Sequence, residues 1–289
     1  MGESYLGVRL DALRRAQNPD GGWGYFPGKQ SWLEPTAYAA LALHGEPAAD
    51  RAWALLKSWQ SADGSWRPSQ EVHVASWGAA LCITVSIGRG EFSDPFQKGV
   101  RWLLDSWGVE SSFVNRAAAR LGFLKAERRL DLKAWPWKPN TSSWVEPTSE
   151  ALVALKKASP KFASDDLRER IQLGEAQLMD VRCRDGGWNY GSPAALGVAL
   201  PSYPETTALA LIGLQGREDL APSLEIAASM ARGTASPLAR AWLAIALSLH
   251  GAEAPQRENA APSSDLMITA IEALGAPYGN YRMLKTAGA

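Results

Sequence analysis

The chain has 289 residues, enough for one large domain or two ordinary ones, and 30 basic side chains balance 30 acidic ones. This balance gives no electrostatic reason to expect a nucleic-acid partner, and it does not indicate contact with an anionic membrane surface. Two cysteines cannot form a disulfide framework, and no apolar run is long enough to span a bilayer, so the sequence predicts a cytoplasmic protein.

Polar helices recur along the chain, and each ends at a glycine-rich turn. Residues 6–16, 49–60 and 165–179 place apolar side chains at helical spacing and carry many charges, so one face of each helix should meet water. The N-terminal segment is therefore predicted to be an amphipathic helix and not a signal peptide. The turns that follow these helices end in tryptophan, a residue that the composition favours strongly, with 13 Trp against 6 Phe.

A second set of helices is rich in Ala and Leu and carries few charges. Its members are residues 32–45, 73–88, 144–158, 203–216 and 237–251. Helices that are apolar nearly all round are buried, so we expect this set to form the interior. Three of them begin with a proline next to a glutamate. Both residues favour a helix start, since proline suits the first helical turn and a carboxylate there interacts favourably with the helix dipole.

The chain ends in a polar loop and a last helix. Residues 252–265 are rich in Pro, Ser and charged residues, and residues 266–275 form an apolar helix that should complete an outer ring or plug one end. The whole of 1–289 is predicted to be one domain of about ten to twelve helices without strands. Buried helices alternating with polar ones form an inner ring within an outer ring, and the apolarity of the inner set favours this closed form over an open superhelix.

The turns share a sequence motif. Two copies, Gln17-Asp20-Gly21-Trp23 and Gln60-Asp63-Gly64-Trp66, read Q-x-x-D-G-x-W; a third keeps Asp185-Gly186-Trp188 but has Arg182 in place of glutamine; residues 133–148 repeat the run of residues 21–36 without the Asp-Gly pair. In these motifs and in the apolar helices after them, the chain resembles the squalene–hopene cyclase and protein prenyltransferase β-subunit superfamily. The resemblance implies an all-α fold, an (α/α) toroid of about six helical hairpins.

The resemblance also implies a structural role for the tryptophans of the turns. In the family, the Gln and Trp of neighbouring repeats stack and hydrogen-bond where an outer helix meets the next inner one. Glycine permits the tight turn, aspartate caps nearby backbone N–H groups, and tryptophan buries a large apolar area. Ligand binding is the alternative role of Trp23, Trp66 and Trp188, but their repeated position favours packing. Trp135 or Trp137 would mark a degenerate fourth site.

The catalytic motifs of the family are missing from the sequence. Class II terpene cyclases protonate their substrate with the middle aspartate of a D-x-D-D motif; here the only Asp pair, Asp165-Asp166, is predicted to cap a helix. Protein prenyltransferases hold zinc through a D-x-C pattern, which does not occur. A zinc site from Asp180, Cys183 and His73 is a weak alternative because its spacing is not diagnostic. The sequence thus predicts no metal and no cofactor.

Glutamates stand where the family places its acid. By this resemblance Glu34, Glu146 and Glu205 would point toward one mouth of the cavity, where a buried carboxyl has a raised pKa and can act as a general acid. The alternative is that each carboxylate serves only its own helix dipole. Glu150 lies one helical turn beyond Glu146, and two like charges so close tend to leave one carboxyl protonated. Glu146 with Glu150 is therefore the favoured acid pair.

Further polar and aromatic side chains in or beside the apolar segments are candidates for substrate binding. They are Tyr38, His73, Trp77, Arg116, Arg240 and Trp144. Tyr38 shares a helix face with Glu34, and His73 shares one with Trp77. Arg116 and Arg240 interrupt apolar segments, as Arg120 does. Because a buried charge needs a partner, one of these arginines is predicted to pair with Glu150 or with an anionic group of the substrate.

Three functions fit these observations. The first is a terpene cyclase-like enzyme, an acid–base lyase or isomerase that binds a hydrophobic, isoprenoid-like molecule in a central cavity and cyclises or isomerises it without a D-x-D-D motif. The second is a non-catalytic toroid that binds a lipid or peptide or serves as a scaffold. The third is a carbohydrate-active toroid, although Glu146 and Glu150 lie closer than glycosidases prefer. A buried acid in a closed apolar pocket would favour the first, a filled core the second, and an open aromatic cleft the third.

Overall fold

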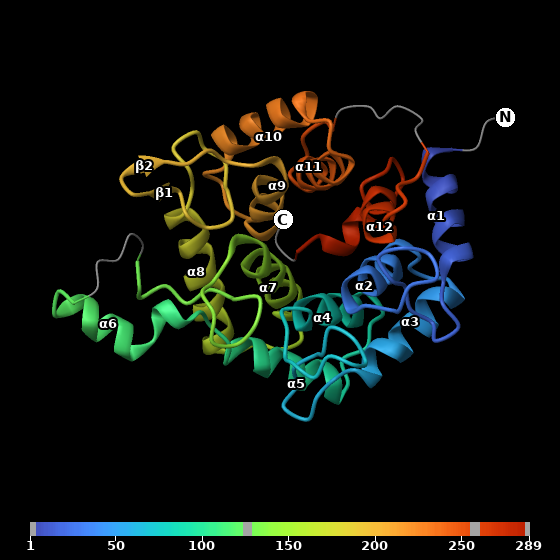
Figure 1. Ribbon diagram of the computed structural model, residues 1–289, viewed down its shortest axis with the longest axis horizontal. Helices are drawn as coiled ribbons and strands as arrows, with labels where there is room; N and C mark the ends of the chain where they lie inside the picture. Colours follow the sequence, from blue (N-terminus) through green and yellow to red (C-terminus); the bar gives the residue numbers. More distant parts are fainter. Residues whose placement is uncertain (1–3, 124–128, 255–260, 287–289) are drawn as a thin grey trace.

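The computed structural model describes residues 4–123, 129–254 and 261–286, and these residues are mostly helical (Figure 1). They contain twelve α-helices, two short 3-10 helices and one pair of two-residue strands. Of the loop predicted at 252–265, residues 255–260 lie outside the described residues. Within the described ranges, no helix is long and apolar enough to cross a membrane.

Six of the described helices form an inner ring. They are α2 (Leu33–Ala42), α4 (Ala79–Gly88), α7 (Val145–Ala158), α9 (Pro204–Gly213), α11 (Pro237–Leu249) and α12 (Leu266–Leu274). Each packs against the next in this order, and α12 packs against α2, so the ring is closed (Figure 1). In α2 every residue except Glu34 is buried, as expected of an interior helix. The prediction of a closed (α/α) toroid is confirmed.

Amphipathic helices surround this ring. Those in the described residues are α1 (Tyr5–Ala16), α3 (Pro47–Ser58), α5 (Asp94–Leu104), α8 (Asp165–Asp180) and α10 (Ala221–Gly233). Each buries one stripe of side chains. In α5, which packs on α4, Phe96, Val100 and Leu103 are buried while Lys98 and Arg101 are exposed. The outer helices are therefore anchored by apolar burial on one face only.

The last helix, α12, is an inner one, so the prediction that it completes the outer ring or plugs an end is wrong. The first helix, α1, packs on its outside and closes the ring. Arg9 Nε donates to Glu272 Oε2 at 2.9 Å, and the two side chains are only 1% and 7% exposed. The Tyr5 ring centroid lies 3.3 Å from the Arg9 guanidinium carbon. A buried ion pair thus joins helices from the two ends of the chain.

Two insertions stand outside the rings. The segment η1 (Val109–Ser111) and α6 (Phe113–Arg120) follow α5, and the hairpin of β1 (Ala194–Ala195) and β2 (Val198–Ala199) precedes α9, where no strand was expected. Helix α6 projects from the edge of the molecule and buries none of its residues (Figure 1). The prediction that Arg116 and Arg120 interrupt an interior helix is therefore wrong.

The second inner helix begins later than predicted. Helix α4 starts at Ala79 and not at residue 73, because the residues before it bond to neighbouring loops. The Ser76 amide donates to the Trp66 carbonyl at 3.1 Å, and the Trp77 amide donates to the Trp137 carbonyl at 3.2 Å. The prediction that His73 and Trp77 share a helix face is accordingly wrong.

Four tryptophans join the outer helices to the inner ones. The indole N–H groups of Trp23, Trp66, Trp135 and Trp188 donate to the main-chain carbonyls of Leu13, Leu56, Leu103 and Leu178, which lie near the ends of outer helices. All four indoles are buried. Since their faces are packed and their only donor is used, these tryptophans have the structural role that their repetition indicates. We call these four contacts the Trp joints.

Each Trp joint is fixed by the residues around it. The main-chain N–H groups of Trp23, Trp135 and Trp188 donate to the hydroxyls of Thr36, Thr148 and Thr207 at the starts of inner helices, an interaction that explains the recurring threonine. The glycine of the motif is required for two reasons, its backbone conformation and its lack of a side chain. Gly64 has φ +94°, and a Cβ there would meet the Lys98 carbonyl oxygen at 2.4 Å.

The C-terminal segment closes one end of the inner ring. The short helix η2 (Tyr281–Leu284) packs against α4 and α11. The Gln215 amide, just past α9, donates to the Leu284 carbonyl at 3.0 Å, and Asn280 donates to the carbonyl of Ala42 at the end of α2. Access to the lumen is therefore left to the other end, where the inner helices begin.

Candidate active site

The starts of three inner helices repeat one arrangement at the open mouth. The N-caps of α2, α7 and α9 are Trp32, Trp144 and Tyr203, and a glutamate stands two residues after each. These are Glu34, Glu146 and Glu205, the carboxyls expected from the sequence. The structure brings Glu34 and Glu146 close enough for each to matter to the other, although α4 lies between their helices.

Burial governs the protonation of the two mouth carboxyls. Burial, together with a smaller contribution from the charge of Glu34, raises the pKa of Glu146 to about 8. The pKa of Glu34 is also raised by burial, although the Tyr25 hydroxyl, which donates to its Oε2 at 2.6 Å, opposes this shift. Asp265, the N-cap of α12, adds to the rise in the pKa of Glu34. Glu146 is therefore the mouth carboxyl that keeps its proton near neutral pH.

One helical turn deeper, Glu150 meets Tyr38 across the lumen. The Tyr38 hydroxyl donates to Glu150 Oε1 at 2.7 Å, and the two residues are 1% and 6% exposed. Burial, reinforced by the charge of Glu146, raises the pKa of Glu150 well above its ordinary value. Burial therefore favours the neutral, protonated form of Glu150 in the folded protein.

The hydrogen bonding indicates which oxygen of Glu150 carries the proton. Oε1 accepts from Tyr38, whereas Oε2 is buried and bonds to no group in the described part of the chain. When the proton is on Oε2, Oε1 remains free to accept the hydrogen bond from the Tyr38 hydroxyl. A proton on Oε2 then has no competing acceptor among the described residues.

Glu150 lines a narrow, apolar cavity inside the ring. Its volume is about 20 Å³, and its lining comprises Tyr38, Leu81, Thr84, Ser149, Glu150, Val153, Leu209, Ile212, Trp242 and Leu284. Leu284, from η2, forms its floor at the closed end. The rings of Tyr38 and Trp242 meet edge to face with centroids 5.4 Å apart. The lumen therefore offers one acid among aromatic and aliphatic surfaces.

The cavity lining follows the repeat. The side chain six residues after the N-cap lines it in five inner helices: Tyr38 in α2, Thr84 in α4, Glu150 in α7, Leu209 in α9 and Trp242 in α11. We call these five side chains the lumen layer. Only one member of the layer is an acid.

The mouth is acidic and aromatic. The Ser236 hydroxyl donates to Glu205 at 3.1 Å, and Asp265 accepts from the first amides of α12. No lysine or arginine of the described residues forms an ion pair with Glu34, Glu146 or Glu205. The half-exposed rings of Trp144, Tyr190 and Tyr203 form a chain at this edge, with centroids 5.9 and 5.5 Å apart.

The predicted arginine partners of Glu150 lie elsewhere. Arg116 is exposed on α6, outside both rings, and Arg240 is exposed and donates to the Thr234 carbonyl at 2.7 Å. Both remain at the surface because α6 and the first turn of α11 point them toward water. The partner of Glu150 is the hydroxyl of Tyr38 and not the predicted arginine. The prediction of a buried ion pair at Glu150 is wrong.

The other aromatic and histidine candidates are separated from the acids. His73 is exposed, with Nδ1 3.0 Å from Arg67 Nη1. Trp77 packs edge to face on Trp137, with centroids 4.6 Å apart. Trp144, by contrast, caps α7 beside Glu146 and reaches the mouth. Sequence patterns thus located the acids and Trp144, but not the surroundings of His73 and Trp77.

No cluster of three His, Cys, Asp or Glu side chains suited to a metal ion occurs in residues 4–123, 129–254 and 261–286. His73 is exposed beside Arg67, Cys183 is buried, and Asp180 accepts from the Arg129 amide. The zinc alternative built from Asp180, Cys183 and His73 therefore finds no support in the geometry.

Three site residues could not be found from the sequence. Tyr25 lies in the first Trp turn, Asp265 in the polar loop before α12, and Trp242 in α11. Asp265 carried a weak signal, since an aspartate before an apolar run predicts a helix N-cap. Tyr25 and Trp242 carried none, because their roles depend on contacts across the ring.

No protein-family model matches the chain, and no curated protein matches it. Several solved structures match the chain. The type II terpene cyclase MstE from Scytonema is 17% identical with a TM-score of 0.56, and the match covers 94% of this chain and 76% of that one. A protein from Actinoplanes is 16% identical with a TM-score of 0.60, covering 98% and 99%. A glycosidase variant is 12% identical with a TM-score of 0.54, covering 86% and 79%. These likenesses establish the α/α toroid fold.

Proposed function

We propose that this chain is a terpene cyclase-like acid catalyst, which protonates a carbon–carbon double bond of a hydrophobic, isoprenoid-like substrate and so cyclises or isomerises it. One observation carries the proposal: Glu150 is a buried carboxyl that lines an apolar cavity, its Oε2 forms no hydrogen bond within the described residues, and burial raises its pKa well above the ordinary value. A carboxylic acid kept neutral by burial can act as a general acid near neutral pH. MstE, which shares the fold, has been solved with geranylgeranyl dihydroxybenzoate as its substrate.

The proposed step moves one proton. The O–H bond at Glu150 Oε2 breaks, and the π electrons of the substrate double bond form the new C–H bond. A carbocation remains on the other alkene carbon, and Glu150 becomes a carboxylate held by the Tyr38 hydroxyl. The cation is then attacked by a second double bond or loses a neighbouring proton. Proton loss gives an uncharged product and returns a proton to the carboxyl cluster.

The surroundings of Glu150 suit such an intermediate. The rings of Tyr38 and Trp242 line the cavity, and the negative face of an aromatic ring attracts a cation by about 0.5–2 kcal/mol. Glu146, one turn nearer the mouth and with a pKa of about 8, can pass a proton to Glu150 between turnovers. The apolar walls keep water away from the cation.

The charges at the mouth favour an uncharged substrate. Glu34, Glu146 and Glu205 stand there without a cationic partner among the described residues. A diphosphate or carboxylate would meet repulsion and no arginine clamp. Isoprenoid alcohols and hydrocarbons avoid that cost.

A second candidate function is favoured by the small lumen. A cavity of about 20 Å³ holds roughly one water-sized group, so a substrate must displace side chains to reach Glu150. A filled lumen is what a non-catalytic lipid-binding, peptide-binding or scaffolding toroid would have. The third candidate, carbohydrate chemistry at Glu146 and Glu150, fits less well, because the lining of this cavity is almost wholly apolar.

Deuterium transfer distinguishes the first two candidates. The protein is incubated in deuterated buffer with geranylgeraniol, farnesol or squalene, and recovered isoprenoids are analysed by mass spectrometry. The proposal predicts deuterium at an alkene carbon of at least one probe, with loss of this label in Glu150→Gln. No label in any probe, together with retained lipid binding, would support the non-catalytic toroid.

A further inference from the structure

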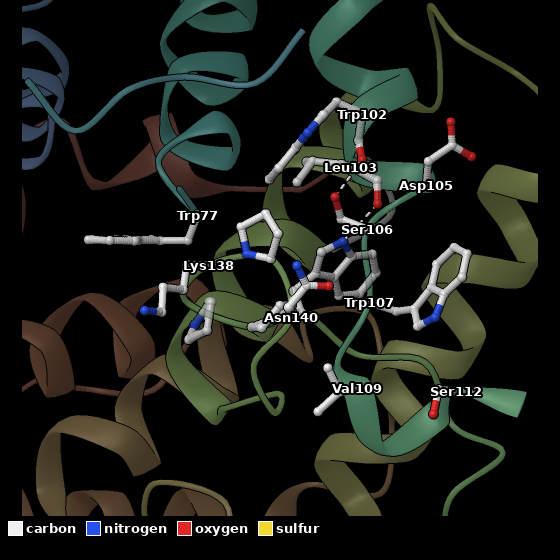
Figure 2. A pocket seen from close by; sticks show the side chains of 14 residues that line it. Trp77, Trp102, Leu103, Asp105, Ser106, Trp107, Val109, Ser112, Lys138 and Asn140 are labelled. Carbon is white, nitrogen blue, oxygen red and sulfur yellow. Dashed lines mark hydrogen bonds between the residues drawn. The ribbon is translucent and has the colours of Figure 1, made fainter. Parts of the chain in front are cut away.

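A second hollow lies outside the inner ring, at the foot of α5. Its volume is about 380 Å³, within the usual range of small-molecule sites of about 300–1,000 Å³. It lies between the end of α5, the chain that leads into η1, and the loop at 136–140 (Figure 2). We call this hollow the α5 groove. It is far larger than the cavity at Glu150 and takes no part in the proposed proton transfer.

Indole rings form much of the α5 groove. Trp77, Trp102, Trp107 and Trp135 line it. Trp135 is a Trp joint, and its N–H is bonded to the Leu103 carbonyl. Trp102 and Trp107 differ, because neither indole N–H makes a hydrogen bond to any described residue, and Trp107 is 39% exposed. Neither indole N–H therefore has a structural partner, unlike those of the four Trp joints.

Polar side chains that form no hydrogen bond or ion pair within the described residues lie among these indoles. Asp105, Lys138 and Asn140 all line the groove, and in the described part of the chain none of their side chains forms a hydrogen bond or ion pair. Figure 2 shows Asn140 between Lys138 and Trp107. Together with the two indole N–H groups they offer carboxylate and amide acceptors beside amide, ammonium and indole donors.

The combination points to a neutral sugar. Among the residues that line the groove, Asp105 and Lys138 carry opposite charges, so the lining itself selects neither an anion nor a cation. Lys133 lies beside it, with Nζ 4.6 Å from the Trp107 ring centroid, and covers one face of that ring. The C–H groups of a pyranose ring carry partial positive charge and pack on the negative face of an indole, while its hydroxyls both donate and accept. A purely apolar ligand would leave these five polar functions unused, and a phosphate would meet the carboxylate of Asp105 beside Lys138.

We propose that the α5 groove binds a neutral pyranose, such as a disaccharide or the sugar part of a glycoconjugate. The site binds its sugar without cleaving it. Glycosidases use a pair of carboxyl groups, whereas Asp105 is the one carboxyl in the lining of this groove. The inference is independent of the proton transfer at Glu150, which lies in a separate cavity.

Saturation-transfer NMR and titration calorimetry on the full chain test the proposal, with maltose, cellobiose, xylobiose and chitobiose as probes. We expect one probe to bind, Trp107→Ala and Asn140→Ala each to weaken it at least about tenfold, and Trp144→Ala to leave it unchanged. Trp144 is a matched control, since it and Trp107 are both 39% exposed. Thermal melts of the variants confirm that each is folded.

Two results would overturn the proposal. One is no binding of any probe up to about 10 mM. The other is binding that Trp144→Ala weakens and Trp107→Ala leaves intact, which would place the sugar at the mouth. If a probe binds in the predicted way, a glycolipid carrying the same sugar is compared with the free disaccharide to decide which source the groove prefers.

Discussion

The Trp joints and the lumen layer come from the same repeat, yet they differ in how strictly they repeat. At the joints the same indole-to-carbonyl bond occurs four times. In the lumen layer five equivalent positions carry Tyr, Thr, Glu, Leu and Trp. The joints are uniform because each does the same work, which is to hold an outer helix on an inner one. We expect chemistry where the repeat varies, and Glu150 is the acid of this variable layer.

The largest expected effect is on turnover. Glu150→Gln keeps the shape of the side chain and removes its transferable proton, so proton transfer should fall by about 10²–10⁴-fold. Deuterium incorporation into an isoprenoid probe measures it. Thr84→Val is the matched control, because Thr84 lies in the same layer and its hydroxyl bonds only within its own helix, to the Ala80 carbonyl. Equal losses in both variants would mean that the layer acts by packing alone.

At the joints the expected effect is on stability. Trp188→Ala removes a fully buried indole and its 2.6 Å bond to the Leu178 carbonyl, and should lower the free energy of unfolding by about 3–5 kcal/mol. Urea unfolding measures this change. Trp144→Ala, at an exposed rim position, should cost under about 1 kcal/mol. Similar costs for the two would contradict the distinction between joint and rim.

The acids of the mouth should make stability fall as pH rises. Glu146 ionises near 4.5 when unfolded and at about 8 when folded, so between these values the folded state binds more protons. The free energy of unfolding therefore decreases across this window, by up to about 1.4 kcal/mol per pH unit for one such carboxyl, and levels off above it. Glu146→Gln should flatten this slope in urea titrations. A slope that is unchanged in the variant would show that Glu146 ionises normally.

Tyr38→Phe gives the smallest effect. It removes the hydrogen bond to Glu150 Oε1 and leaves the ring against Trp242, so it should cost about 1 kcal/mol of unfolding free energy. Activity should fall less than in Glu150→Gln, because the acid remains and loses only the donor that stabilises its carboxylate. A complete loss of activity in a folded Tyr38→Phe would make Tyr38 the proton donor instead.

The sequence predicts the fold well because the fold is local. The Q-x-x-D-G-x-W turns and the alternation of apolar and polar helices depend on neighbours within a few residues. Where a local pattern misled, the cause was a loop: residues 73–78 look like the start of a helix but are fixed by bonds to Trp66 and Trp137. Helix α12 was misassigned because its partner α1 lies at the other end of the chain.

The site was predicted only in part, because its contacts join residues that are far apart in the sequence. Glu34, Glu146 and Glu205 were proposed because their helix starts repeat, and Glu150 because it lies one helical turn beyond Glu146. The contact of Tyr38 with Glu150 spans 112 residues, and no local spacing indicates it. The arginine predictions failed because a buried charge was expected to need a cation, whereas Glu150 is neutralised by its own proton. Tyr25 and Trp242 gave no signal, since only closure of the ring brings them to the acids.

The most direct test of the central claim is the protonation of Glu150 itself. Infrared difference spectroscopy at neutral pH compares the intact protein with Glu150→Gln in the region of the carbonyl stretch of protonated carboxylic acids. We predict a band in the intact protein that is absent from Glu150→Gln and that shifts in Tyr38→Phe, as the hydrogen bond to Oε1 is lost. If the intact protein shows only the carboxylate band at neutral pH, Glu150 is ionised and cannot be the acid.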